Sequence, residues 1–304
     1  MNGNLFLDFQ KFSVYYGSFA AVNTFHLTVP EGIIGLLGPN GAGKTSLIKG
    51  LLGLIPSTKG NVFIYQRSIK DKMIRQRIGY MPEDDTLISG LNAVAFVTYM
   101  GVLAGMSRIE ARKRAHVVLS YVGIGEMRYR KIDTLSKGNH QRLKLAAALV
   151  HDPDALFLDE PTSGLDPKGH ADMLKLIREI GKSGKDMLIS SHLVNEIERV
   201  CQQIMVIQDG KLKKYERIDN LKEGQSLVYR VSIRGDGETF LALLKKRGVA
   251  LLARDGNHFT VQLADEAVKP ALFQACLAQE IQIRVFIPQE HTLQEALMDI
   301  IDAG

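Results

Sequence analysis

The segment with the clearest chemistry is a glycine-rich run that ends in a lysine and a threonine, Gly38-Pro39-Asn40-Gly41-Ala42-Gly43-Lys44-Thr45. It has the spacing of the phosphate-binding loop, in which glycines let the backbone curl so that its N–H groups face phosphate oxygens. The run stands between a strand-like segment, 33–37, and a helix-like segment, 46–52, so a positive helix end points at the same anion. Lys44 is expected to reach the β- and γ-phosphates, and Thr45 to offer a hydroxyl to Mg²⁺. Residues 38–45, with Ser46 after them, are therefore expected to bind a nucleoside triphosphate.

Two adjacent carboxylates follow another apolar run. Asp159 and Glu160 close the segment 155–158, which places both at the carboxyl end of a buried strand, where α/β sheets bind ligands. Adjacent strand residues point to opposite sides, so the two carboxylates are expected to do different work. We assign Asp159 to Mg²⁺, through water, and Glu160 to polarising the attacking water. A plain helix-capping pair is the alternative explanation.

The elements that must hold these residues alternate short apolar runs with amphipathic segments up to about residue 216. Four of the runs are short, continuous and bounded by glycine, proline or charge, as buried parallel strands are: 33–37, 156–158, 187–189 and 204–207. Between residues 83 and 150 the strand-like runs stop and helical spacing takes over, for instance over 111–122. The pattern predicts an α/β core over residues 1–217 with a helical subdomain at about 84–150.

A polar segment, 218–225, is expected to be a linker to a second domain at 226–304. Beyond it the alternating and helical patterns follow in the order strand, helix, strand, strand, helix, strand, which is the ferredoxin-like α+β arrangement. Thr292 and Glu295 have capping-box spacing and predict a closing helix. The role of this domain is open between dimerisation, ligand sensing and bracing an assembly.

Composition limits the class of protein. The length of 304 residues exceeds the usual domain size of about 100 to 200 residues, which favours two domains. An apolar share of 45% and a charged share of 23% are typical of a soluble globular protein. No signal sequence or spanning segment is recognisable, so we expect the chain to stay in the cytosol. Cys201 and Cys276 are expected to be reduced, packed thiols, and the Lys and Arg residues behind the net charge of +5 are too dispersed to indicate a nucleic-acid partner.

The order of motifs over residues 5 to 215 resembles the ATP-binding cassette family. Leu135-Ser136-Lys137-Gly138-Asn139 stands where the family has its Leu-Ser-Gly-Gly-Gln signature, and Ser163-Gly164-Leu165-Asp166 follows Glu160 at the spacing of the loop that links the two sites. The resemblance implies that the signature contacts the γ-phosphate of ATP held by another subunit, and that Asp166 is the acidic member of its loop. Ser136 is placed as an N-cap whose helix would present N–H donors to an anion, although a capped helix alone would explain the segment. Lys137 and Asn139 depart from the common pattern, since one adds a cation and the other shortens an amide.

The resemblance implies roles for three more residues. His192, after the run 187–191, matches the switch histidine, which contacts the γ-phosphate and holds the attacking water in line. Tyr16 matches the aromatic residue that stacks on adenine, with Tyr15 as the fallback and a core aromatic as the alternative. Glu83 occupies the position usually taken by glutamine, and its carboxylate can accept from water or approach Mg²⁺ but cannot donate.

The resemblance implies an ATP-hydrolysing subunit of an ABC transporter. Two copies, or one copy and a related subunit, would close on two ATP molecules and drive separate integral membrane permease subunits from the cytoplasmic face of the plasma membrane. Glu83 and the carboxy-terminal extension resemble exporter-type members. The alternative is a cassette ATPase acting in translation, DNA repair or cofactor assembly, but the helical subdomain lacks the sustained heptads of a coiled-coil insertion.

Overall fold

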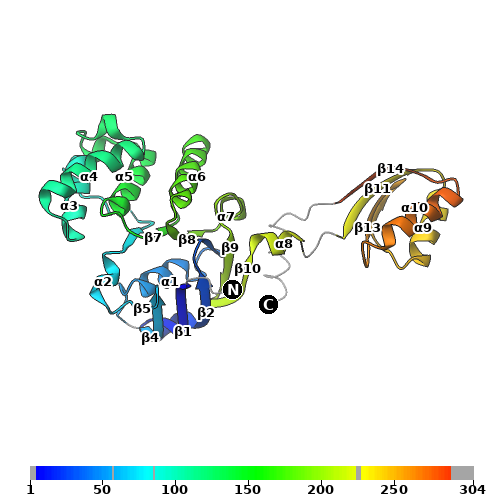
Figure 1. The fold of residues 1–304 in the computed structure, drawn as a ribbon, viewed down its shortest axis with the longest axis horizontal. Helices are drawn as coiled ribbons and strands as arrows, with labels where there is room; N and C mark the ends of the chain where they lie inside the picture. The colour runs from blue at the N-terminus through cyan, green and yellow to red at the C-terminus, as the bar shows by residue number, and fades with distance from the viewer. Residues whose placement is uncertain (1–4, 57, 85, 224–226, 289–304) are drawn as a thin grey trace. The chain divides into compact units, whose positions relative to one another are not determined.

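The computed structural model describes residues 5–56, 58–84, 86–223 and 227–288 (Figure 1). The chain divides after Ile218 into two compact units, and each is described by itself. The boundary falls in the segment that the sequence suggested as a linker. Part of that segment is helix α8 (Ile218–Glu223), so it is more ordered than its polar composition indicated.

The first unit contains two sheets. The six-stranded sheet has the order β10-β9-β3-β8-β7-β6, in which only the edge strand β10 runs antiparallel to its neighbour. Its strands are β3 (Ile33–Leu37), β6 (Ile78–Met81), β7 (Ala155–Asp159), β8 (Asp186–Ser191), β9 (Gln203–Gln208) and β10 (Lys211–Arg217). The four apolar runs predicted as buried strands thus lie in β3, β7, β8 and β9. The register pairs Leu37 with Ser191 and Asp159 with Ser190, so the loops that follow β3, β7 and β8 leave the sheet at one edge.

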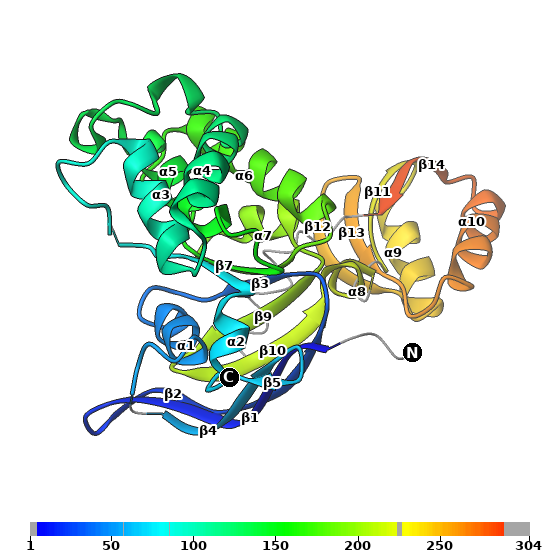
Figure 2. The ribbon, with the colours of Figure 1, turned by 60° about the vertical axis from the view of Figure 1, so that its left-hand side comes forward.

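The second sheet of this unit is antiparallel and has the order β2-β1-β4-β5. Its strands are β1 (Leu5–Tyr16), β2 (Phe19–Pro30), β4 (Thr58–Ile64) and β5 (Arg67–Ser68). Helix α1 (Lys44–Leu51) contacts strands of both sheets, and Figure 2 shows it beside them. A single apolar core joins the sheets through this helix, with Phe9, Leu47 and Leu188 fully buried. The helices α2 (Lys72–Arg75), α6 (Pro167–Lys182) and α7 (Val194–Val200) complete the packing.

Helices make up the predicted insertion. They are α3 (Ala93–Leu103), α4 (Arg108–Tyr121), the short 3-10 turns η1 (Gly125–Met127) and η2 (Ile132–Thr134), and α5 (Lys137–Leu149). Three of them begin at side-chain caps, since Asn92, Ser107 and Ser136 each accept a hydrogen bond from an N–H of the first turn. No helix in the described ranges is long and apolar enough to cross a membrane.

The second unit has the predicted order of elements. They are β11 (Val228–Arg234), α9 (Gly237–Lys246), β12 (Ala250–Asp255), β13 (His258–Gln262), α10 (Val268–Ala278) and β14 (Gln282–Pro288). The sheet order is β12-β13-β11-β14, and its core is closed by apolar residues of α9 and α10 such as Phe240 and Leu272. The closing helix expected near Thr292 and Glu295 lies outside the described residues.

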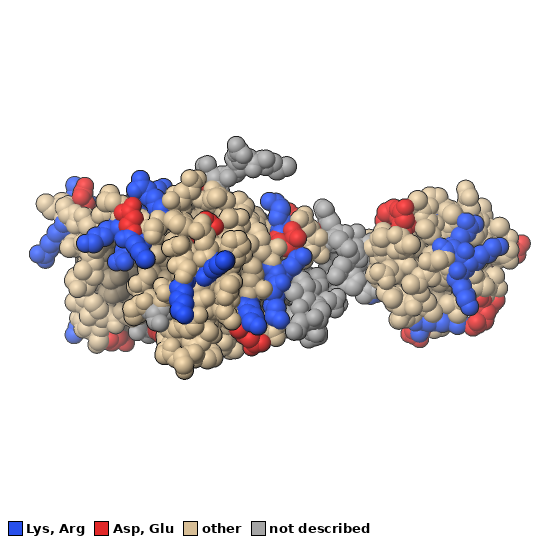
Figure 3. Space-filling view, turned by 90° about the horizontal axis from the view of Figure 1, so that it is seen from below, with Lys and Arg blue, Asp and Glu red and all other residues tan. Residues whose placement is uncertain are grey.

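The thiols and the surface charge follow the sequence-based expectation. Cys201 and Cys276 are both buried and free, which confirms that they are packed thiols, and burial raises the pKa of each. On the face of the molecule in Figure 3, Lys and Arg side chains are interspersed with uncharged and acidic ones. The dispersal along the sequence is therefore also seen on this face.

Candidate nucleotide site

The glycine-rich run forms the loop between β3 and α1, as predicted. A side chain at Gly38 would place its Cβ 2.3 Å from the carbonyl oxygen of Ile207, and Gly43 has a φ of 103° with Ala21 O 2.4 Å from the same position, so both must be glycine. Gly43 is also the N-cap of α1 and supplies no side-chain cap, which leaves the first-turn N–H groups of the helix available to an anion. Lys44 is 6% exposed, and its Nζ donates to the carbonyl oxygens of Gly38 at 2.8 Å and Pro39 at 3.3 Å.

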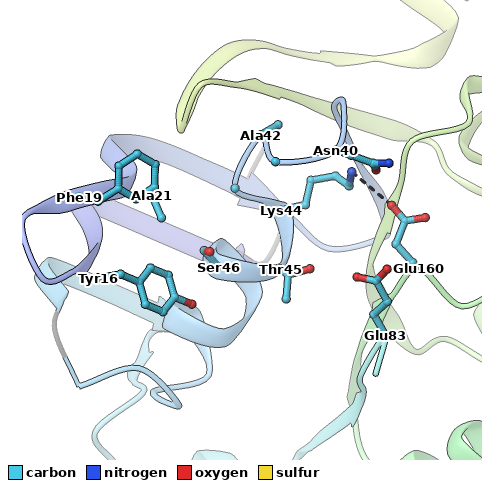
Figure 4. A pocket seen from close by; sticks show the side chains of 12 residues that line it. Tyr16, Phe19, Ala21, Asn40, Ala42, Lys44, Thr45, Ser46, Glu83 and Glu160 are labelled. Carbon is cyan, nitrogen blue, oxygen red and sulfur yellow. Dashed lines mark ion pairs between the residues drawn. The ribbon is translucent and has the colours of Figure 1, made fainter. Parts of the chain in front are cut away.

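A cavity of about 310 Å³ opens over this loop (Figure 4). Its lining residues are Tyr16, Phe19, Ala21, Asn40, Gly41, Ala42, Gly43, Lys44, Thr45, Ser46, Glu83 and Glu160. The two aromatic side chains stand at one end, and Lys44 with the two glutamates stands at the other. The cavity thus has an aromatic end suited to a base and a charged end suited to phosphates.

Phe19 is a lining residue that the sequence reasoning missed. It pairs with Tyr16 across the tight turn between β1 and β2, and its side chain is 67% exposed. The signal available in the sequence was a second aromatic residue across the short Gly17-Ser18 segment from Tyr16. In the structure both rings are exposed.

Asp159 is fully buried beside this cavity. Ser190 Oγ donates to its Oδ1 at 2.6 Å and the hydroxyl of Thr45 lies nearby, whereas Oδ2 has no hydrogen-bond partner among the described residues. Burial is the main reason that the pKa of Asp159 is raised. A buried carboxylate oxygen without a partner, next to a threonine hydroxyl, is a donor set that fits Mg²⁺.

Glu83 offers another oxygen ligand at the charged end of the cavity. Its pKa is raised, first by burial and then by the carboxylates of Asp159 and Glu160, so a bound cation would relieve this repulsion. Nowhere in the described residues do three or more His, Cys, Asp or Glu side chains gather as a metal site on their own. Such an ion would therefore complete its coordination with water and phosphate oxygens.

Glu160 lies just beyond the end of β7. Its φ of 45° is left-handed, which is uncommon for a residue other than glycine, and its N–H donates to Ser190 Oγ at 2.9 Å. We predicted that alternation along the strand points Asp159 and Glu160 to opposite sides. The reason was wrong, because β7 ends at Asp159 and the left-handed turn sets the direction of the Glu160 side chain. Its Oε1 lies 3.2 Å from Lys44 Nζ, and its Oε2 lies 2.9 Å from His192 Nδ1. A carboxylate held between a lysine and a histidine can accept a proton from a water molecule.

A buried carboxylate supports the loop that carries His192. Glu196 accepts hydrogen bonds from Thr162 Oγ1 at 2.6 Å and Ser191 Oγ at 2.5 Å, and it also contacts His170 Nε2. These contacts join helix α7, which carries Glu196, to the loop after β7, the last residue of β8 and helix α6. The sequence reasoning did not identify Glu196, because its partners come from separate segments.

The signature residues lie outside this cavity. Ser136 caps α5, with its Oγ accepting from the N–H of Asn139 at 3.4 Å, and Asp166 caps α6, with its Oδ1 accepting from the N–H of Gly169 at 3.2 Å. Neither these residues nor Gly138 lines the nucleotide cavity, whereas Lys137 lines a second hollow of about 330 Å³. The second hollow is bordered by Glu83, Asp84, Lys137, His140, Gln141, Lys144 and Ser163. One chain thus places its phosphate loop and its signature at separate sites.

Comparison with known proteins gives the family. The model of the family described as ABC transporter matches residues 22–163. The uncharacterized ABC transporter ATP-binding protein YxlF of Bacillus subtilis (strain 168) is 31% identical over 281 residues, which cover 92% of this chain and 93% of that protein. The Nod factor export ATP-binding protein I of Burkholderia lata is 36% identical over 208 residues, which cover 67% of this chain and 68% of that protein. The linearmycin resistance ATP-binding protein LnrL of Bacillus subtilis is 32% identical over 244 residues, covering 79% of this chain and 78% of that protein.

Solved structures share the fold. The ATP-binding cassette MJ0796, in a dimeric post-hydrolysis state bound to ADP and Pi, has a TM-score of 0.63 and 24% identity, covering 69% of this chain and 98% of that one. The cbiO1 protein from Clostridium perfringens, described as part of the ABC transporter complex cbiONQ, has a TM-score of 0.62 and 25% identity, covering 70% and 89%. These likenesses confirm the predicted α/β cassette core. By its near full-length similarity to named members, the chain belongs to the ABC transporter family as an ATP-binding, ATP-hydrolysing subunit.

Proposed function

We propose that this subunit powers export through separate integral membrane permease subunits, at the cytoplasmic face of the plasma membrane. Support comes from two relatives whose names refer to Nod factor export and linearmycin resistance. The role in translation, DNA repair or cofactor assembly is less favoured, because the relatives named above are ABC transporter, export or resistance proteins.

The subunit acts as a dimer with a second copy of itself or a related subunit. The observation that carries this proposal is that the signature, residues 135–139, does not line the cavity that Lys44 lines. Ser136 is the N-cap of α5, and the positive end of this helix would meet an anion held by another chain. Two chains would thus complete two ATP sites, each with one chain's phosphate loop and the other's signature, and Asp166 would lie in the loop between them.

Within one site the residues divide the work. Tyr16 stacks on adenine, and the N–H groups of residues 38–46 hold the phosphates together with Lys44. Thr45, Asp159 and Glu83 would hold Mg²⁺, directly or through water, and the ion would neutralise charge on the phosphate oxygens. Glu160 accepts the proton of the attacking water, and His192 orients the Glu160 carboxylate and contacts the γ-phosphate.

The permease is expected to dock on the helical insertion. A hollow of about 570 Å³ is lined there by apolar and aromatic residues of α3, including Tyr99 and Val102, together with Arg108 and Arg112 of α4. Leu103 beside it is 62% exposed. This surface has the apolar and cationic character that a cytoplasmic helix of a membrane subunit could cover.

The catalytic part of the proposal is tested with Glu160→Gln. Glutamine keeps the shape of the side chain but cannot accept the proton, so we expect ATP binding to persist while hydrolysis falls by about 100-fold or more. The variant should accumulate as a nucleotide-bound dimer on size-exclusion chromatography. Turnover at the wild-type rate would remove the assignment of Glu160.

The transport part is tested by purifying the tagged wild-type chain from detergent-solubilised membranes. We expect integral membrane subunits to copurify with it in a defined ratio. Recovery of a ribosome or DNA complex without a membrane protein would overturn the transporter proposal and favour the alternative.

A further inference from the structure

Helix α5 buries a lysine that none of the steps above uses. Lys144 is 4% exposed, and the buried residues next to it in the helix are mainly leucine and alanine. Burying an ammonium group is costly unless it is well hydrogen-bonded, and an apolar residue at such a position is often as good for stability or better. A buried lysine here therefore calls for an explanation other than packing.

The ammonium of Lys144 is directed at the backbone that follows β6. Its Nζ donates to three consecutive carbonyl oxygens, those of Pro82 at 3.0 Å, Glu83 at 2.8 Å and Asp84 at 3.3 Å. An ammonium group has three donors and suits three converging acceptors, whereas the planar guanidinium of arginine does not. The contact spans 60 to 62 residues of sequence, so it fastens the loop of residues 82–84 to α5.

Both ends of this link carry residues of the ATP sites. Helix α5 begins with the signature at Ser136. Glu83 lines the nucleotide cavity together with Lys44 and Glu160, and it also lines the second hollow together with Lys137. Among the described lining residues, Glu83 alone is common to both hollows, and it belongs to the loop that Lys144 holds.

We propose that Lys144 is a positioning residue that fixes the Glu83 loop to the signature helix, so that the signature and the Glu83 carboxylate move as one unit. When the signature of this chain contacts the nucleotide bound to the partner subunit, the position of Glu83 at this chain's own metal site would change with it. The proposal rests on the role given to Glu83 in the proposed function. Lys144 does not touch the nucleotide cavity, so its effect passes through Glu83.

Lys49 provides a matched control. It extends from α1, and its Nζ lies 3.7 Å from Asp84 Oδ2, so it meets the same loop from the core. This pair is partly exposed and involves a side chain in place of backbone carbonyls, and such pairs contribute little to stability. Lys49→Met therefore removes a lysine that contacts this loop, while the hydrogen bonds between the loop and α5 stay in place.

The experiment measures steady-state ATP hydrolysis by the full chain over a range of Mg²⁺ and ATP concentrations. For Lys144→Met we expect kcat to fall about tenfold, the half-saturating Mg²⁺ concentration to rise several-fold, and the KM for ATP to change by less than about twofold. Lys49→Met should stay within about twofold of wild type in all three quantities. Partial unfolding would lower the apparent kcat without raising the half-saturating Mg²⁺ concentration, and circular dichroism with thermal melting checks the fold.

A double-variant cycle separates this inference from the proposed function. If Lys144 acts through Glu83, Lys144→Met should have no further effect on kcat in a Glu83→Ala background. Additive effects, or an unchanged kcat in Lys144→Met, would overturn the positioning role alone. Unchanged hydrolysis in Glu83→Ala by itself would overturn the role of Glu83 and the inference with it. If Lys144→Met does not fold, Lys144→Gln, which keeps an amide donor, takes its place in the cycle, with a smaller fall in kcat expected and again no further effect in the Glu83→Ala background.

Discussion

The two units of this chain differ in what they bury. Among the described residues of the first unit, twelve polar or charged ones are buried, including Lys44, Lys144, Asp159, Glu160 and Glu196. In the described part of the second unit no charged residue is buried, and the core consists of apolar residues such as Val231, Phe240 and Leu272 with Tyr229 and Cys276. Because buried charge costs stability, it is retained where it serves a ligand or a mechanism.

This difference assigns the chemistry to one unit. The first unit buries charged side chains, at a cost in stability, at the carboxyl ends of its parallel strands, where the phosphate loop, Asp159 and Glu160 meet. The second unit has an ordinary apolar core, so any function it has must come from its surface, where Leu277 is 81% exposed. Paired substitutions in the two units test the comparison, and they are ordered below by the size of the expected effect.

The largest effect is expected at Lys44. Lys44→Ala removes the main cation facing the β- and γ-phosphates, so the affinity for ATP should fall by about 100-fold, equivalent to about 2.7 kcal/mol. Lys269→Ala in the second unit removes a partner of Glu266 and of the Tyr229 ring, far from the phosphate loop in sequence, and should leave the affinity unchanged. Titration with a fluorescent ATP analogue measures both, and equal affinities for the two variants would break the comparison.

A smaller effect is expected at His192. His192→Ala leaves Glu160 without its 2.9 Å partner, so kcat should fall by about 10- to 100-fold while ATP affinity is kept. His258→Ala, on the exposed side of β13, should leave kcat unchanged. Single-turnover hydrolysis separates the chemical step from binding, and full activity without His192 would contradict its assignment.

A still smaller effect on ATP hydrolysis is expected at Tyr16. Stacking of a base on an aromatic ring contributes about 1 to 3 kcal/mol, so Tyr16→Ala should raise the KM for ATP by about tenfold with little change in kcat. Phe19→Ala tests whether the second ring at this end of the cavity contributes. Phe273→Ala in the second unit, which removes a comparably exposed ring, should change neither quantity.

The smallest effects concern stability, and they should have opposite signs in the two units. Burial raises the pKa of Asp159, so its ionised form disfavours the folded state, and Asp159→Asn should stabilise the nucleotide-free protein at neutral pH. Hydrogen bonds from Thr239 and Glu238 lower the pKa of Asp236, so Asp236→Asn should destabilise helix α9.

Lowering the pH should remove the difference in stability between each variant and the wild type, but over a different pH range for each site. The gain from Asp159→Asn disappears as the pH falls through the raised pKa of Asp159, because the wild-type carboxyl then becomes neutral as well. The loss from Asp236→Asn persists to lower pH and disappears only as the pH falls through its lowered pKa. Hydrogen exchange of β7 and α9 measured from pH 8 downward follows each site, and a parallel pH dependence would contradict the sign of one shift.

Local patterns in the sequence predicted the parts of the site that follow one another along the chain. The phosphate loop lies between a strand and a helix, and Asp159 ends a buried strand, so residue order alone was sufficient. The parallel register then brings these strand ends to one edge without further information. The predicted N-cap at Ser136 was confirmed for the same reason, since a cap depends on residues three apart.

Features that depend on tertiary contacts or backbone conformation could not be predicted. The contact of Lys144 with residues 82–84 spans some 60 positions, and no local pattern marks it. The left-handed turn at Glu160 is not indicated by residue type, since glutamate rarely adopts it. Helix α8 formed where polar composition suggested a linker, because charged residues are also compatible with a short helix.

The turn at Glu160 also determines how this protein can be used as bait. Because the backbone aims the side chain and Ser190 fastens the backbone N–H, glutamine at this position should keep the same direction as glutamate. A chain with this substitution would retain its nucleotide and remain assembled through long washes. Immobilised in that form, it would present the closed dimer to the proposed membrane subunits for longer than the cycling wild-type protein does.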